Sequence, residues 1–474
     1  MTNEDTICAI STPHGVGGVA MVRVSGPAAI DAVNRIWKGK NLAAVTSHTA
    51  HLGTLIDDTD SSPGEPLDQG VAVVYRAPNS FTGEDVVELN VHGSVYVQER
   101  LLKVLMRHGC RLANAGEFTR RAFASGKLDL AQAEAVADVI ASSTRTSHRI
   151  AISQMRGAYS DRLASLRDSL LELCTLLELE LDFSEEDVEF ASRGQLMSIA
   201  TKTADEIDSL CSSFARGNAI KNGIPVAIIG RTNAGKSTLL NAILGEERAI
   251  VSDIHGTTRD FIEDTVNIDG ALFRLTDTAG LRETSDYIES IGIEKAKDRA
   301  RKASVVIWLT DATDAECVIP SQVDIIREIA RENPDCKIIP AINKCDIAKD
   351  EVVGPIAAKI ELFGKTEPQM CHTIKLCAKD GAGLDELLKA IPDAAGVNTI
   401  SAGDILVTNA RHYESLTNAS ISIARVIDAL NAGLSGDLIA QDLRETIDHL
   451  SAITARVTSS EILQNIFSRF CIGK

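Results

Sequence analysis

A length of 474 residues exceeds what a single hydrophobic core can organise and predicts roughly three domains. The 66 acidic residues outnumber the 48 basic ones, which gives a net charge of -18, and only 4% of the residues are aromatic. The chain as a whole therefore repels a phosphate backbone and offers few platforms for base stacking. These properties exclude a protein that grips nucleic acid over a broad surface of its own.

The sequence also indicates the compartment. No run approaches the roughly 18 apolar residues of a membrane span, and the first ten residues lack the basic segment of a secretory signal. The ten cysteines are scattered without a C-x-x-C pair, which favours reduced thiols over a zinc ribbon or disulfide frame. We therefore expect a cytoplasmic protein with no membrane attachment. The final CIGK does not change this, because Lys474 is a poor last residue for prenylation.

Residues 1–125 are expected to form an N-terminal α/β or α+β domain. Short apolar stretches separated by glycine, proline and acidic turns predict strands near residues 6–12, 17–26, 70–78 and 85–93. A helix is predicted over residues 97–109, where Gly109 suits its end. His92 lies beside Gly93, and we expect it to make a structural hydrogen bond.

Helical periodicity replaces this pattern at 126–216, the first part of a predicted helical domain. Leucines at positions 163, 166, 170, 173 and 177 fall on one face of a helix and indicate a bundle core. A hydrophilic break is expected at 182–194. Residues 217–225 are predicted to be a linker that ends at Pro225.

The segment GRTNAGKS at 230–237 matches G-x-x-x-x-G-K-[ST] between an apolar strand (226–229) and the helical TLLNAIL (238–244). Glycines are needed there because backbone N–H groups must close around phosphate oxygens. Lys236 is expected to bridge the terminal phosphates and Ser237 to ligate Mg²⁺, with the helix N-terminus facing the anion. This order of strand, loop and helix predicts a nucleotide-binding P-loop.

Three further motifs predict guanine as the base and hydrolysis as the reaction. DTAG at 277–280 follows the strand-like 271–276, so Asp277 can hold a water on the metal and Gly280 can meet the γ-phosphate. NKCD at 343–346 follows the apolar 337–342, and Asp346 can accept hydrogen bonds from two donors that guanine has and adenine lacks. CAK at 377–379, after the apolar stretch 372–377, can offer backbone N–H groups to the guanine carbonyl.

The expected switch loop is VSDIHGTTRD at 251–260. Thr258 is the preferred second Mg²⁺ ligand, and Thr257 is the competing assignment. Leu281 occupies the position after DTAG where many GTPases orient water with a Gln, so another group must do this work. Arg259 is an internal candidate for a cation at the phosphates, although an arginine there is as often paired structurally with an acid.

These motifs place a GTPase domain at 220–392, followed by a linker at 392–403 and a second helical segment at 400–474. Helical patterns on both sides of an inserted domain predict one discontinuous bundle. The expected fold class is thus multidomain α+β and α/β, with an inserted Ras-like P-loop GTPase domain on a mostly parallel sheet.

GRTNAGKS, DIHGTTRD, DTAGLRETSDYIESIGIEKA and the terminal CIGK resemble the bacterial and organellar tRNA modification GTPase family MnmE, also called TrmE, over essentially the whole chain. The resemblance implies that K⁺ replaces an arginine finger, with Asn233, Ser252, Ile254 and Thr257 as its ligands. It also implies that Glu289 orients the attacking water, which makes Glu289, Lys236 and Thr258 the expected catalytic residues.

The motifs and the resemblance together predict one set of GTP-binding residues. They are Asn233, Ala234, Gly235, Lys236, Ser237, Thr238, Ser252, Asp253, Ile254, His255, Gly256, Thr257, Thr258, Asp277, Thr278, Ala279, Gly280, Asn343, Lys344, Asp346, Cys377, Ala378 and Lys379. Two of these positions depart from the family pattern. Ser252 replaces the common Thr but keeps an oxygen, and Cys377 replaces Ser and loses a hydroxyl.

By the same resemblance, the N-terminal domain dimerises and binds a 5-formyltetrahydrofolate-type folate through Arg23, Glu88, Lys127 and Lys474. For each residue considered alone, a surface salt bridge is the alternative interpretation. The implied function is modification of C5 of the wobble uridine in certain tRNAs, with the flavoprotein MnmG (GidA) as partner in a heterotetramer. The alternative function is a regulatory GTPase of ribosome assembly or translation.

Overall fold

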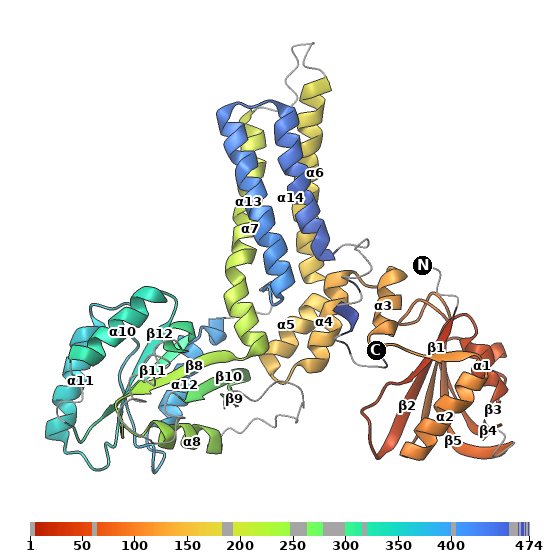
Figure 1. Ribbon diagram of the computed structural model, residues 1–474, viewed down its shortest axis with the longest axis horizontal. Helices are drawn as coiled ribbons and strands as arrows, with labels where there is room; N and C mark the ends of the chain where they lie inside the picture. The colour runs from red at the N-terminus through yellow and green to blue at the C-terminus, as the bar shows by residue number, and fades with distance from the viewer. Residues whose placement is uncertain are drawn as a thin grey trace, which may run out of the picture. The chain divides into compact units, whose positions relative to one another are not determined.

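The computed structural model (Figure 1) describes residues 5–58, 64–182, 193–246, 263–277, 299–314, 320–399 and 404–454, together with 463, 466–468, 470 and 473. The chain divides into two compact units. The first combines residues 1–140, 153–203 and 421–474, and the second combines residues 141–152 and 204–420.

The N-terminal part of the first unit is built on a sheet with the strand order β3-β4-β5-β6-β2-β1-β7. Only the β1–β7 pair is parallel among the described strands, so this domain has α+β organisation. Its elements are β1 (Thr6–Ile10), β2 (Gly17–Ser25), α1 (Ala29–Arg35), β3 (Trp37–Lys38), a 3₁₀ turn (Leu42–Ala44), β4 (Thr49–Asp57), β5 (Glu65–Tyr75), β6 (Val86–Gly93), α2 (Val95–Arg107), β7 (Cys110–Leu112) and α3 (Glu117–Ala124).

Alternating apolar residues give this sheet one face for a core. Val22 and Val24 of β2 are fully buried, and they share a cluster with Val33 of α1 and Leu101 of α2. Helices α1 and α2 therefore cover the sheet on that face (Figure 1). The predicted helix at 97–109 is confirmed as α2, which is followed by Gly109 at φ +87, a conformation that favours glycine.

A buried arginine joins α3 to the start of the chain. Arg121 is 1% exposed and contacts Asp5 Oδ1 at 2.8 Å, Glu84 Oε2 at 3.1 Å and Glu117 Oε1 at 3.2 Å. Arg111 holds Glu117 through two hydrogen bonds of 2.6 and 3.0 Å. Burial opposes ionisation of Glu117, but these partners and the Asn114 N–H outweigh it and hold the pKa of Glu117 below its ordinary value.

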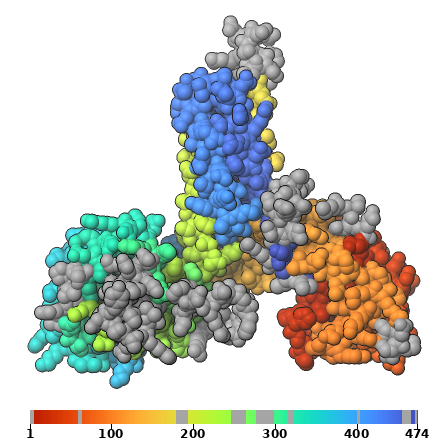
Figure 2. Space-filling view, in the orientation of Figure 1, coloured from red at the N-terminus to blue at the C-terminus, as the bar shows by residue number. Residues whose placement is uncertain are grey.

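The helical part of the chain comprises α4 (Leu130–Ala141), α5 (Arg145–Met155), α6 (Ala158–Asp182), α7 (Arg193–Asn222), α13 (Ala410–Ala432) and α14 (Gly436–Thr454). The five predicted leucines of α6 are each at most 2% exposed, which confirms the predicted apolar face. Figure 2 shows α13 and α14 packed along each other. Arg425 Nε of α13 donates to Asp442 Oδ1 of α14 at 2.8 Å. Arg193 of α7 bonds Leu430 O at 2.8 Å, so segments from both sides of the GTPase domain build one discontinuous bundle.

The second unit is built on a sheet with the order β13-β12-β11-β8-β10-β9, in which only β9 is antiparallel among the described strands. The mostly parallel Ras-like sheet predicted from the sequence is thus confirmed. Its elements are β8 (Ile224–Gly230), α8 (Lys236–Glu246), β9 (Glu263–Ile268), β10 (Ala271–Asp277), β11 (Val305–Asp311), α10 (Pro320–Glu332), β12 (Lys337–Asn343), α11 (Asp350–Gly364), β13 (Ile374–Lys375), α12 (Leu384–Ala394) and a 3₁₀ turn (Val397–Thr399).

Both faces of this sheet are covered. Leu239 of α8 and Leu387 of α12 share one core cluster with the sheet, whereas Ile329 of α10 and Ile356 of α11 share another. Burial on both sides explains why the strands are nearly continuous apolar runs. Within the apolar stretch 372–377, Ile374–Lys375 pair with β12 as the short strand β13.

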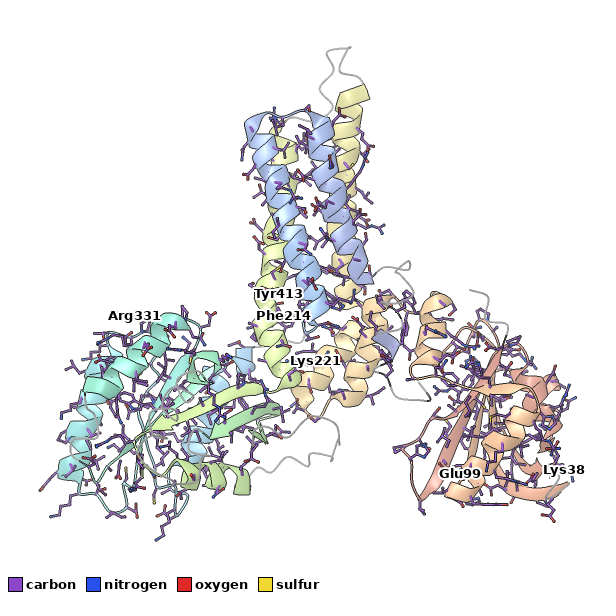
Figure 3. All side chains as sticks on the ribbon, viewed as in Figure 1. Lys38, Glu99, Phe214, Lys221, Arg331 and Tyr413 are labelled. Carbon is purple, nitrogen blue, oxygen red and sulfur yellow. The ribbon has the colours of Figure 1, made fainter. Side chains whose placement is uncertain are left out.

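The segments that lead into and out of the second sheet, residues 213–217 and 407–413, lie against each other. Phe214 of α7 stacks on Tyr413 of α13, with ring centroids 4.4 Å apart (Figure 3). Ser213 Oγ accepts the Val407 N–H at 3.1 Å, and a Cβ at Gly217 would lie 2.2 Å from Val407 O. These contacts hold the two connecting segments of the second unit against each other.

Two global expectations can be compared with the described residues. No helix among them is long and apolar enough to cross a membrane. The eight cysteines that the structure describes are all free, and five of them are buried.

His92 forms the expected structural hydrogen bond, with Nδ1 2.7 Å from Asp68 Oδ1.

The Glu117 network predicts a pH-dependent stability. Because the folded-state pKa of Glu117 lies below its unfolded value, its contribution is present above about pH 4.5 and is lost as the pH falls through the folded pKa. Replacing Glu117→Gln should lower the free energy of local unfolding at pH 7 by about 1.5–3 kcal/mol. The substitution should also flatten the pH dependence of this unfolding free energy below pH 5. Hydrogen exchange of the β1 amides measures both quantities.

Glu99 provides the matched control because its carboxylate is exposed on α2 (Figure 3). The Glu99→Gln substitution makes the same chemical change and should leave both quantities unaltered. An equal pH dependence in the wild-type protein and the Glu117→Gln variant would contradict the assigned role of Glu117.

Candidate nucleotide-binding site

The P-loop connects the central strand β8 to α8. Gly230 ends β8, where an added Cβ would lie 2.3 Å from Leu309 O of β11. The loop then turns through Asn233 at φ +66 and Gly235 at φ +93 before α8 begins at Lys236. A chain path with two residues at positive φ is what lets successive backbone N–H groups turn to one side, as phosphate binding requires.

The predicted phosphate and metal ligands lie at the start of α8. Lys236 Nζ lies over the loop, 2.9 Å from both Gly230 O and Arg231 O. The next residue, Ser237, is exposed on the first turn of the helix. Asp277 ends β10 and pairs in register with Ile228 of β8, so its backbone lies at the same edge of the sheet. The Ser237 hydroxyl at this edge suits Mg²⁺, which prefers oxygen ligands.

Asn343 joins the P-loop to the two loops expected to contact the base. This residue ends β12 and is 3% exposed. Its Nδ2 donates to Ala234 O at 2.8 Å, and its Oδ1 accepts the Ala378 N–H at 2.9 Å. One buried amide therefore sets the spacing between the P-loop, NKCD and CAK segments.

The predicted guanine-binding residues lie directly beside this amide. Asp346 is exposed, and its neighbour Cys377 is 3% exposed. Burial, together with a hydrogen bond to Asp346, raises the pKa of Cys377. The Cys377 N–H itself donates to Ala382 O at 2.8 Å.

The structure brings together the predicted residues Asn233–Thr238, Asn343, Lys344, Asp346 and Cys377–Lys379. The remaining predicted ligands Ser252, Asp253, Ile254, His255, Gly256, Thr257, Thr258, Thr278, Ala279, Gly280, Glu289 and Lys474 lie outside the described residues. Of the predicted K⁺ ligands, the structure describes Asn233, which is exposed. Within the described part of the chain, no cluster of three His, Cys, Asp or Glu side chains forms a separate metal site.

A second group of predicted residues meets in the N-terminal domain. Arg23 of β2 and Glu88 of β6 are cross-strand partners joined by a 2.8 Å ion pair, and Tyr75 OH lies 3.3 Å from Glu88 Oε2. The Arg23 guanidinium lies over the rings of Phe81 and Phe118, with centroids at 5.5 and 5.6 Å. Arg23 and Glu88 therefore form a salt bridge with each other, and since their side chains are only 11% and 17% exposed it is not the surface salt bridge of the alternative interpretation.

The chain end and Lys127 approach the same region. Gly473 O accepts from Ser11 Oγ at 2.9 Å and from Arg23 Nη1 at 3.4 Å. Lys127 is exposed, and its side chain lies near Gly83, which follows Phe81 by two residues. A Cβ added to Gly83 would be 3.7 Å from Lys127 Cγ. The aromatic residues Tyr75, Phe81 and Phe118 were not predicted, because single aromatics on separate elements carry no sequence motif.

The Ras-like sheet, the P-loop and the NKCD loop at its carboxyl edge define a P-loop protein of the GTPase class. The family model "GTP-binding protein TrmE N-terminus" matches residues 6–127, and the model "MnmE helical domain" matches residues 130–471. The chain therefore belongs to the MnmE (TrmE) family.

Relatives named "tRNA modification GTPase MnmE" match along the whole chain. The protein of Parabacteroides distasonis is 49% identical over 478 residues, covering 99% of this chain and 100% of its own length. The proteins of Bacteroides thetaiotaomicron and Flavobacterium johnsoniae are 47% and 45% identical, with full coverage of both chains.

Solved structures match part of the chain. A variant of Aquifex aeolicus Era bound to GDP and AlF4⁻ is 29% identical, covering 42% of this chain and 66% of its own, with a TM-score of 0.29. The FeoB G-domain of Methanococcus jannaschii is 24% identical, covering 36% of this chain and 97% of its own, with a TM-score of 0.26.

The contact between Gly235 and Asn343 gives a direct test of the site. A Cβ at Gly235 would lie 2.3 Å from Asn343 Nδ2, and the φ of +93 strains any side chain there. The Gly235→Ala substitution should therefore weaken binding of a fluorescent guanine nucleotide by about 10- to 100-fold, since such strain costs about 1–3 kcal/mol. Titration of the purified full chain measures this loss.

Gly245 offers the matched control on the adjoining helix α8. A Cβ there meets nothing within 4 Å, and alanine favours a helix. Gly245→Ala should retain wild-type affinity. Wild-type affinity in Gly235→Ala would show that the close approach to Asn343 does not shape the site.

Proposed function

We propose that this protein is a K⁺- and Mg²⁺-dependent GTP hydrolase that acts in the modification of tRNA. The observation that carries the proposal is the Asn343 link between P-loop and base-recognition loops, in a chain that matches the MnmE family over its whole length. The reaction proposed for the tRNA is the formation of an aminomethyl- or carboxymethylaminomethyl-type group at C5 of the wobble uridine.

Each part of the nucleotide site has a chemical task in this proposal. The N–H groups at the start of α8 and the ammonium group of Lys236 stabilise charge on the transferred phosphoryl group. Ser237 and Thr258 provide hydroxyl ligands for Mg²⁺, and Asp277 holds a water on it. Asp346 accepts two hydrogen bonds from guanine, and its exposure beside Cys377 leaves it accessible to a base.

The monovalent cation takes the place of an arginine finger in the proposal. Asn233, Ser252, Ile254 and Thr257 are its proposed ligands, and Glu289 is the proposed orienter of the attacking water. Leu281 cannot hydrogen-bond water, which supports a role for another residue. K⁺ would supply positive charge where the leaving phosphate becomes more negative.

The N-terminal site is proposed to bind a folate that carries a one-carbon unit. Arg23 and Lys127 provide cations for a glutamate tail, and Glu88 provides a carboxylate for an aminopyrimidine ring. The Phe81 ring lies beside Arg23 and is 38% exposed, so it adds a surface on which a flat pterin can stack. Lys474 is proposed to contribute at the rim, and the bond from Ser11 to the neighbouring Gly473 supports this placement of the tail.

The proposed assembly is a homodimer that joins the flavoprotein MnmG in a heterotetramer. The net charge of -18 supports a partner that supplies most of the grip on tRNA. A cytoplasmic location belongs to the same proposal and agrees with the free cysteines of the described chain.

Replacing K⁺ by Na⁺ at constant ionic strength should lower GTP turnover by about 10²-fold, because the loss of one charge-stabilising group has about this effect. Phosphate release from the purified full chain measures turnover. GDP affinity is the control and should be the same in both salts. Equal turnover in the two salts would remove K⁺ from the proposal.

The cellular function can be tested in bacteria that lack the corresponding gene. Plasmids that carry the wild-type gene should restore the modified wobble uridine, whereas Lys236→Ala and Glu88→Gln should not, because they disable the nucleotide and folate sites respectively. Mass spectrometry of digested tRNA measures the modification.

Two controls separate these sites. Purified Glu88→Gln protein should hydrolyse GTP normally but fail to retain 5-formyltetrahydrofolate in equilibrium dialysis, and Glu99→Gln should restore the modification fully. Full modification with Lys236→Ala would argue that GTP hydrolysis is not needed for the reaction.

A further inference from the structure

The lysine of the NKCD loop is held by an acidic residue that no motif includes. Lys344 Nζ lies 2.6 Å from Asp311 Oδ2, and the Asp311 side chain is 17% exposed. Asp311 ends β11 and pairs in register with Asn343 of β12, while the Ala312 N–H donates to Asn343 O at 2.9 Å. The two strand ends therefore place this pair directly beside the Asn343 link.

The Asp311 carboxylate is itself oriented. Its Oδ1 accepts the Thr313 N–H at 2.9 Å and the Thr313 hydroxyl at 2.7 Å, so Oδ2 is directed to Lys344. Burial opposes ionisation, but the bonds from Lys344 and Thr313 outweigh it and hold the pKa of Asp311 below its ordinary value. Asp311 is thus an ionised, preoriented partner for the lysine at neutral pH.

The backbone of Lys344 is unusual as well. Its φ of +65 lies in the left-handed region, which a lysine adopts at a cost and keeps only when its surroundings hold it there. The 2.6 Å ion pair to Asp311 supplies such a constraint. With its ammonium group fixed, Lys344 can present its methylene stem as an apolar wall for a base or ribose.

We infer that Asp311 is a positioning residue for nucleotide binding, which acts by holding Lys344 against the nucleoside part of a guanine nucleotide. This inference rests on the proposed function, because it takes the NKCD loop to bind guanine. Asp311 itself does not contact the nucleotide in this account. The turn after Asp311 also contacts the P-loop through an ion pair between Arg231 and Asp314. Both of these side chains are more than a third exposed, so this ion pair contributes little to the free energy of folding.

A double-mutant cycle tests the inference. Asp311→Asn should weaken binding of GDP about tenfold, the effect of losing one charged hydrogen bond, and should raise KM for GTP without changing kcat at saturation. Lys344→Gln should weaken binding by at least as much. The double variant should bind no more weakly than Lys344→Gln alone, because the two residues act as one unit.

A second variant avoids any change of charge. Thr313→Val removes the 2.7 Å hydroxyl bond to Asp311 and should weaken GDP binding about two- to threefold. Asp324→Asn is the matched control, because it removes the same charge from an exposed pair on α10 and should bind normally. Thermal unfolding curves should show that all variants are folded at the temperature of the binding measurement.

Losses that simply add in the double variant, or wild-type affinity in both Asp311→Asn and Thr313→Val, would overturn the inference. A fall in kcat together with a fall in the unfolding midpoint would point to a purely structural role and would overturn it too. If the wild-type protein fails to bind GDP at all, the proposed function fails first, and the inference that depends on it falls with it.

Discussion

The nucleotide site depends on one buried amide. Asn343 uses its two polar atoms to tie Ala234 of the P-loop to Ala378 of the loop after β13. A buried amide with both groups satisfied is costly to disturb, because any displacement leaves a polar atom without a partner. Asn343 therefore fixes the spacing between three loops, and the requirement for glycine at 235 follows from the space that the Asn343 side chain occupies.

The parallel sheet explains why these loops meet at all. The strands β8, β10, β11 and β12 run the same way, so Gly230, Asp277, Asp311 and Asn343 all end at one edge. Each strand is nearly continuous in apolar residues because helices cover both faces, which leaves polar residues to gather where the strands stop. The position of the site is thus a consequence of the same burial that stabilises the sheet.

The sequence predicted those features that local chemistry dictates. The P-loop was recognisable because the phosphate path demands glycines between a strand and a helix, and the leucines of α6 were recognisable because helix geometry places them on one face. Contacts between distant segments were not predictable. The Lys344–Asp311 pair and the Arg23–Glu88 bridge each join residues whose proximity depends on strand register, which a single sequence does not display.

The N-terminal site illustrates the same limit. Arg23 and Glu88 were each expected to be either ligands or surface ions, and the structure shows them paired and flanked by aromatic rings. The Arg23 guanidinium lies over two rings and beside the Glu88 carboxylate, so its orientation is fixed by contacts from several separate elements.

Guanine recognition by a preassembled site is the central claim, and isothermal titration of the full chain with GDP and with ADP under identical conditions tests it most directly. The account predicts saturable one-site binding of GDP and no measurable heat with ADP, because Asp346 pairs with two donors that adenine lacks. Equal affinity for the two nucleotides, or no binding of GDP, would contradict it.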